Sequence, residues 1–222
     1  MKTPSALRFA LVLSLSLFSS GLLAATNPEL SGRVVFVDGE VTANGRVADT
    51  GDLLVGPQVL KTGKASIIEV VFAGRNVFRV GPESVVRVDF SQQKKTVNLD
   101  RGEFTSVLKK LAQAAGEPSF ILKTPTVAAG VRGTSFHVST DGQSTYFCTC
   151  NGSVQLEDGT PADEVQLTNA HHGARIFTKN SDGTITVTTG GLQGHTDADL
   201  ETLGSRIGVG IDWTKPDLDH GQ

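Results

Sequence analysis

The feature that most constrains the fold is a long succession of short strand patterns, each closed by a turn. Asp38-Gly39 and Asn44-Gly45 are dipeptides typical of two-residue hairpin loops. Gly81-Pro82 ends a further strand pattern, and residues 84–90 alternate apolar and polar side chains after it. Parallel βαβ units would need helical crossovers between the strands. We therefore predict an all-β fold, and the pattern alone leaves a sandwich, a barrel and an irregular roll open.

Two segments have the pattern of short helices. Residues 105–115 (TSVLKKLAQAA) gather apolar side chains on one side, and Gly116 is placed to end a helix there. Near the C-terminus, Thr196 is followed three residues later by Asp199, which is typical of an N-cap with an acid at the third helical position. We expect this second helix to run to about Arg206.

The N-terminus is predicted to be a signal peptide, residues 1–25. Lys2 and Arg8 supply positive charge, residues 7–23 are apolar, and the small residues Ala24-Ala25 follow. We expect export to the periplasm or beyond, with membrane attachment only if this segment stays uncleaved. No later stretch is apolar enough to cross a bilayer. Residues 26–30 then form a short leader.

Composition and motifs exclude several function classes. The formal net charge is −3 and the charges are evenly mixed, so there is no basic stripe for nucleic acid. The sequence contains no nucleophile elbow, zinc-protease helix, phosphate-binding loop or dinucleotide fingerprint. We therefore expect a protein that is not an enzyme.

The segment 124–138 (TPTVAAGVRGTSFHV) is the most distinctive in the chain. Gly130 and Gly133 indicate backbone that turns sharply or approaches a neighbour closely. Arg132 stands between them among uncharged residues, so we expect a carboxylate or several carbonyls to accept its hydrogen bonds. Either Arg132 holds a turn together, or it contacts an anion or a partner.

This segment resembles the signature of the FecR domain. The similarity extends over residues 31–158 and includes GRVVFVDGEVTAN, TGKASIIEVVF, FRVGPESVVRV, VNLDRGEF and NGSVQL, in that order. The resemblance implies an elongated, twisted β-sandwich or roll with glycine corners. It also marks Gly130, Arg132, Gly133 and Thr134 as family signature residues, structural or partner-binding. Residues 159–222 would be a C-terminal extension of strands, a short helix and a mobile tail.

FecR proteins of the sensing type place a cytoplasmic segment, which handles a sigma factor, ahead of a membrane span and a periplasmic portion. In this chain the apolar run begins within the first ten residues, so we expect no direct sigma-factor contact. The resemblance then implies a periplasmic binding or scaffold module, accessory to envelope signalling of the iron-uptake type. Its partner would be an envelope protein or a glycan.

Cys148 and Cys150 are the only cysteines. In a strand, residues two apart point to the same face, so both thiols would project together. Three interpretations stay open. The pair could form a strained, readily reduced disulfide, chelate a soft or borderline metal, or fill a core as two small apolar side chains.

Imidazoles downstream could complete a metal site. His171 and His172 are adjacent, so extended backbone would bring at most one of them to a given site, unless the chain turns at Gly173. His195 directly precedes the predicted helix cap. We therefore hypothesise a Cys₂His₂-like site for a transition metal such as zinc. The alternative function is a metal- or redox-responsive periplasmic protein.

Overall fold

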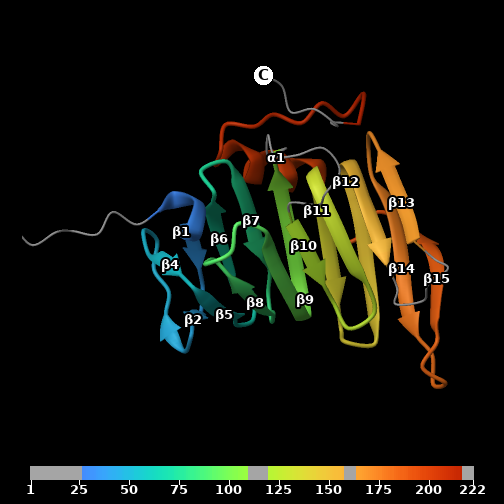
Figure 1. Cartoon of the computed structure of the whole chain (residues 1–222), viewed down its shortest axis with the longest axis horizontal. Coiled ribbons are helices and arrows are strands. Elements are labelled where there is room, and N and C mark those ends of the chain that lie inside the picture. The colour runs from blue at the N-terminus through green and yellow to red at the C-terminus, as the bar shows by residue number, and fades with distance from the viewer. Residues whose placement is uncertain (1–26, 110–119, 158–163, 217–222) are drawn as a thin grey trace, which may run out of the picture.

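The computed structural model describes residues 27–109, 120–157 and 164–216. Within these residues the chain forms one 15-stranded sheet, a short 3-10 helix at Pro28–Leu30 and the helix α1 (Figure 1). The bounds are β1 Ser31–Asp38, β2 Val41–Ala43, β3 Arg46–Val47, β4 Leu53–Val55, β5 Pro57–Thr62, β6 Ile67–Phe72, β7 Asn76–Val80, β8 Val85–Asp89, β9 Lys95–Leu108, β10 Phe120–Lys123, β11 Ala128–Thr140, β12 Ser144–Glu157, β13 Glu164–Asn169, β14 Gly173–Lys179, β15 Ile185–Gly190 and α1 Asp197–Ser205. The predicted all-β class is confirmed.

The sheet folds onto itself because three long strands each serve both layers. The first half of β9 pairs with β8 and β10, and its second half pairs with β7 and β11. In the same way β12 pairs with β14 through its first half and with β13 through its second. These strands bend at Gly102, Gly133 and Gly152, which have φ of 93°, 54° and 116°. Glycine is the residue that adopts such angles without strain.

Phenylalanine rings fill the space between the two layers. Phe104 stacks on Phe78 with ring centroids 5.1 Å apart, and Phe136 stacks on Phe147 at 5.6 Å. Phe120 lies within 6.2 Å of Phe104 and links the two pairs. Each of these side chains is at most 2% exposed. Since a buried aromatic side chain stabilises a fold by roughly 1.5–3 kcal/mol, this row is the main apolar core.

The predicted helix over residues 105–115 is wrong where the structure describes it. Residues 105–108 end strand β9, and residues 110–115 lie outside the described residues. Val107 and Leu108 are both buried, but on opposite faces of the strand. A strand that is covered on both faces has a continuous run of apolar residues. The spacing of apolar residues in such a run does not distinguish a strand from a short helix.

The C-terminal segment covers the outer face of one layer. The predicted cap is confirmed: Thr196 accepts from the backbone N–H of Asp199, whose carboxylate accepts from the Thr196 N–H. Leu200 and Leu203 are buried in a second apolar cluster against Val77 of β7 and Val107 of β9. Figure 1 shows α1 (red) along one side of the sheet, followed by the chain that leads to the C-terminus.

An ion-pair network around a buried carboxylate holds both ends of α1. Glu69 of β6 is 0% exposed, and its carboxylate accepts from Arg79 at 2.7 Å and from Arg206, the C-cap of α1, at 2.7 Å. Arg79 also reaches Asp199, in the first turn of α1, at 3.4 Å. The helix is therefore held by charge at both ends and by apolar packing along its length.

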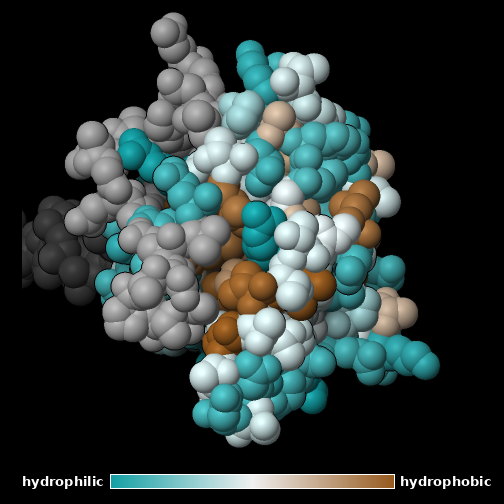
Figure 2. All heavy atoms as spheres, turned by 90° about the vertical axis from the view of Figure 1, so that its right-hand side faces the viewer, coloured by the Kyte–Doolittle hydropathy of each residue, from teal (hydrophilic) through white to brown (hydrophobic). Residues whose placement is uncertain are grey.

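The end of the molecule that carries β13, β14 and β15 shows apolar side chains at its surface (Figure 2). Val187 of β15 and Leu192 just beyond it are 38% and 54% exposed. Among the described residues, no helix has the length and apolar character needed to cross a membrane.

Candidate metal centre

Strand β12 brings the two thiols together. Tyr146, Cys148 and Cys150 alternate onto the outer face, while Phe147 packs into the core between the layers. Both cysteines are free thiols with 0% exposure, and their Sγ atoms lie 3.6 Å apart. Of the three open interpretations, the disulfide is not the state seen here.

The turn between β13 and β14 supplies the first imidazole. His172 has a φ of 42°, in the left-handed region, and its backbone N–H donates to the Cys150 carbonyl at 3.0 Å. This turn directs His172 toward the thiols, with its Nδ1 atom 3.5 Å from Cys148 Sγ. The His171 side chain is 50% exposed, and its Nε2 atom bonds the Asp197 carboxylate at 3.0 Å rather than a thiol. The expectation that only one of the adjacent histidines faces the cysteines agrees with this arrangement.

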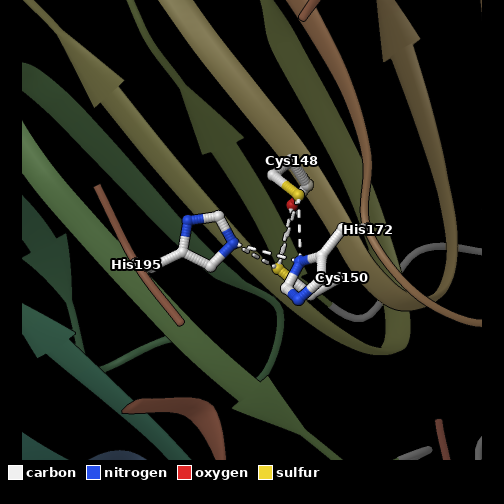
Figure 3. Close-up of side chains that lie close together, drawn as sticks. All are labelled: Cys148, Cys150, His172 and His195. Carbon is white, nitrogen blue, oxygen red and sulfur yellow. Dashed lines mark hydrogen bonds between the residues drawn. The ribbon is translucent and has the colours of Figure 1, made fainter. Parts of the chain in front are cut away.

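The segment before α1 supplies the second imidazole. The Nε2 atom of His195 lies 3.2 Å from Cys150 Sγ and 3.3 Å from His172 Nδ1. Figure 3 shows the two rings and the two sulfur atoms converging on one point. These four donor atoms all lie within 4.8 Å of one another. The four residues come from β12, the turn after β13 and the segment before α1.

Four of the six distances between the donor atoms are close to those of a tetrahedral site. Zinc bonds of about 2.3 Å to sulfur and about 2.0 Å to nitrogen put two tetrahedral sulfurs about 3.8 Å apart, two nitrogens about 3.3 Å apart and mixed pairs about 3.5 Å apart. The corresponding distances here are 3.6 Å between sulfurs, 3.3 Å between nitrogens, and 3.5 and 3.2 Å for two of the four mixed pairs. The other two mixed pairs lie within 4.8 Å, so all four donors are near enough to share one ion.

A hydrogen-bond acceptor orients each imidazole from the side of the ring that faces away from the thiols. His195 donates from Nδ1 to the Gln193 carbonyl at 2.7 Å, which leaves the Nε2 lone pair facing Cys150. His172 donates from Nε2 to the Asp197 carboxylate at 2.6 Å, which directs Nδ1 at Cys148. A carboxylate or carbonyl behind each histidine is the usual outer arrangement of a metal site. Asp197 and Gln193 were not among the predicted site residues, because neither forms a ligand motif in the sequence.

The cluster separates charge before any metal enters. The hydrogen bond from Cys150, followed by those with His172 and His195, lowers the pKa of the Cys148 thiol despite its burial. Burial raises the pKa of Cys150. Burial also acts to lower the pKa of His172, but hydrogen bonds with Cys148 and Asp197 outweigh it, and the net pKa is raised. These shifts favour the thiolate form of Cys148 and the thiol form of Cys150.

Two further rings enclose the cluster. His137 of β11 stacks on His195 with centroids 4.3 Å apart, and burial lowers the pKa of His137 to about 3. Trp213, the only tryptophan, stacks on His172 at 5.3 Å. His195 and His172, which are 7% exposed and 10% exposed at the side chain, thus lie between a buried imidazole on one side and an indole on the other.

The signature residues lie at the bend of β11. Gly133 adopts its positive φ at a β-bulge, and the Thr134 hydroxyl donates to the Ser153 carbonyl at 2.7 Å across the sheet. Gly130 pairs with Gln155 of β12. Within the described part of the chain, no acceptor bonds the Arg132 guanidinium, so the expected intramolecular acceptor is not found there. Gly133 and Thr134 shape the fold at this point.

The comparisons agree with the sequence signature. The model of the family described as FecR protein matches residues 58–155. Those residues form a FecR domain. Two of its strands, β11 and β12, carry the signature residues and both cysteines, whereas His172 and His195 lie beyond the matched range. The four-residue cluster therefore draws on both the FecR domain and the C-terminal extension.

Solved structures give a more distant likeness. Two crystal structures, each of a proposed anti-sigma factor from Parabacteroides distasonis, are 19% and 18% identical to this chain with TM-scores of 0.48. The matches cover 60% and 59% of this chain and the same shares of those chains. No curated protein matches the chain.

Proposed function

We propose that the chain is an exported, non-catalytic FecR-type module that binds one zinc ion through Cys148, Cys150, His172 and His195. The observation that carries the proposal is the convergence of two sulfur and two nitrogen donors within 4.8 Å of one another, with four of their six distances close to those of a tetrahedral S₂N₂ site. Two thiolates and two imidazoles suit zinc, and they do not suit magnesium or calcium, which prefer oxygen ligands. Four protein ligands close the coordination shell, as in structural zinc sites.

The zinc ion would fasten the C-terminal extension to the FecR domain. Both cysteines belong to the domain, while the two histidines come from the extension on either side of β14 and β15. Since α1 packs on the same outer face through Leu200 and Leu203, the ion and the helix hold one continuous covering layer. A metal that bridges distant segments stabilises the folded state by its binding free energy.

A titration with matched histidine variants tests zinc binding. Purified protein with reduced thiols should take up one zinc per chain in competition with a chromophoric chelator. Cobalt in the same site should give the intense visible bands of tetrahedral thiolate coordination. His172→Ala should lose both signals. The neighbouring variant His171→Ala should keep them, because His171 is half exposed and is not one of the four donor residues. Equal binding by both variants, or no binding by the parent, would remove the proposal.

The proposed location rests on residues 1–25, which lie outside the described residues and have the sequence of a signal peptide. Fractionation against cytoplasmic and periplasmic markers, with N-terminal sequencing of the purified protein, tests this. Periplasmic protein beginning near Asn27 is expected. Recovery of the uncleaved chain from the cytoplasm would contradict it.

The proposed role is to bind an envelope protein or glycan in signalling of the FecR type. Arg132 supports a partner contact because its guanidinium has no hydrogen-bond acceptor among the described residues. An open groove of about 700 Å³, lined by Arg101, Glu103, Asp141 and Tyr146, offers a second polar surface. Affinity capture from envelope extract, comparing the parent with Arg132→Ala, should show a partner that the variant loses. Identical capture by both would show that Arg132 makes no such contact.

A further inference from the structure

Strand β15 is an unprotected edge of the sheet. It pairs with β14, and no described strand pairs with its other side. Its sequence, ITVTTG, contains no charge and no proline, and its four central residues are exposed. Edge strands in soluble proteins usually carry lysine, proline or a bulge that prevents pairing with another chain. Uncharged β-branched residues at such an edge favour pairing instead.

The hydrogen bonds at the adjacent turn show which backbone groups face outward. The Asn180 N–H donates to the Thr184 carbonyl at 2.8 Å, so Thr184 faces β14. The Lys179 N–H donates to the Gln143 carbonyl, on the side of β14 away from β15. Lys179 lies opposite Ile185, so these two residues do not bond each other and the backbone groups of Ile185 face the open edge. Because backbone groups alternate along an antiparallel strand, the N–H and C=O groups of Ile185, Val187 and Thr189 point to the open edge.

We propose that β15 is a self-association surface, which pairs antiparallel with β15 of a second copy of this chain about a twofold axis at Val187. This register sets Val187 opposite Val187 and Ile185 opposite Thr189. Every outward N–H and C=O of these residues then finds a partner, as hydrogen-bonded pairs of an antiparallel ladder require.

Side chains and charge favour a second copy as the occupant. A twofold axis perpendicular to the sheet joins the two copies so that the interior faces of both lie on one side of the combined sheet. Two residues that pair across the axis must therefore both face the layer interior or both face away from it. The register at Val187 meets this condition, and Thr186 then faces Thr188. Valine pairs and threonine pairs are favourable neighbours across strands, and no like charges meet. Val187 and Leu192 are exposed apolar side chains, at 38% and 54%.

The test is sedimentation equilibrium of the exported chain and of charge variants at position 187. The parent should dimerise. Val187→Lys and Val187→Glu should each weaken self-association by about tenfold or more, because two like charges would face each other across about 5 Å. An equimolar mixture of the two variants should restore a dimer. Val187 is 38% exposed, so neither change disturbs the core.

Leu192→Lys is the matched control, because it adds the same charge at an exposed apolar residue just beyond the end of β15. It should leave the dimer intact. A monomeric parent would overturn the proposal, and so would a mixture of charge variants that stays monomeric. Loss of the dimer in Leu192→Lys but not in Val187→Lys would show association through the apolar patch rather than through the strand edge.

Discussion

Replacing Cys150 by alanine should make the stability of this protein almost independent of zinc. Cys150 is fully buried, so loss of its sulfur alone should cost about 1 kcal/mol in the metal-free protein. With free zinc held at 100 times the dissociation constant, the parent gains about 2.7 kcal/mol of stability that the variant lacks. The variant should therefore be destabilised by about 1 kcal/mol in chelator and by about 4 kcal/mol in zinc.

Thermal unfolding in zinc-buffered solution measures both values. In a chain of this size 1 kcal/mol corresponds to roughly 2–4 °C in Tm. The expected shifts are therefore roughly 2–4 °C in chelator and roughly 8–16 °C in zinc. Trp213 fluorescence provides a local reading, since its ring stacks on His172.

Thr149→Val is the matched control on the same strand. Among the residues that the structure describes, the buried Thr149 hydroxyl has no hydrogen-bond partner, so its removal should not destabilise the fold and should leave the zinc effect unchanged. The reasoning is refuted if zinc raises the Tm of Cys150→Ala as much as that of the parent.

Three further results are expected. Gly102→Ala should cost about 2–4 kcal/mol in urea unfolding, because its φ is 93° and a Cβ would lie 2.1 Å from Ser84 Oγ; an unchanged midpoint would show that β9 does not need this corner. Apparent zinc affinity should fall as pH is lowered, because zinc must displace protons from Cys150 and His172, whose pKa values are both raised without metal; a flat profile would exclude this competition. A diazene oxidant that takes two electrons from the thiolates of Cys148 and Cys150 should release one zinc per disulfide formed, as read by a zinc indicator; oxidation with zinc retained would contradict thiolate ligation.

The sequence was sufficient for the fold class because its turns are local. Asn44-Gly45 closes the two-residue hairpin of β2 and β3, and Thr196 with Asp199 begins α1. The hairpin predicted in the same way at Asp38-Gly39 is wrong: Gly39 turns the chain with a φ of 77°, but β1 pairs with β4 and β6 and β2 pairs with β3 and β5. The end of β9 was mispredicted because Val107 and Leu108 are each buried by a different layer. Burial on both faces depends on distant strands, which no local pattern reports.

The candidate metal site could also be predicted in part from local pattern. Strand alternation alone places Cys148 and Cys150 on one face. The choice of His172 over His171 depends on the backbone turn at His172, where φ is 42°, and the position of His195 depends on where α1 docks. The supporting Asp197 follows from that docking as well, since its carboxylate belongs to the first turn of α1.

X-ray absorption at the zinc edge tests the metal centre most directly. Protein purified from the periplasm with its thiols reduced should contain one zinc whose first shell holds two sulfurs at about 2.3 Å and two nitrogens at about 2.0 Å. A shell of oxygen and nitrogen alone, or protein without stoichiometric zinc after incubation with the ion, would contradict the assignment of Cys148, Cys150, His172 and His195.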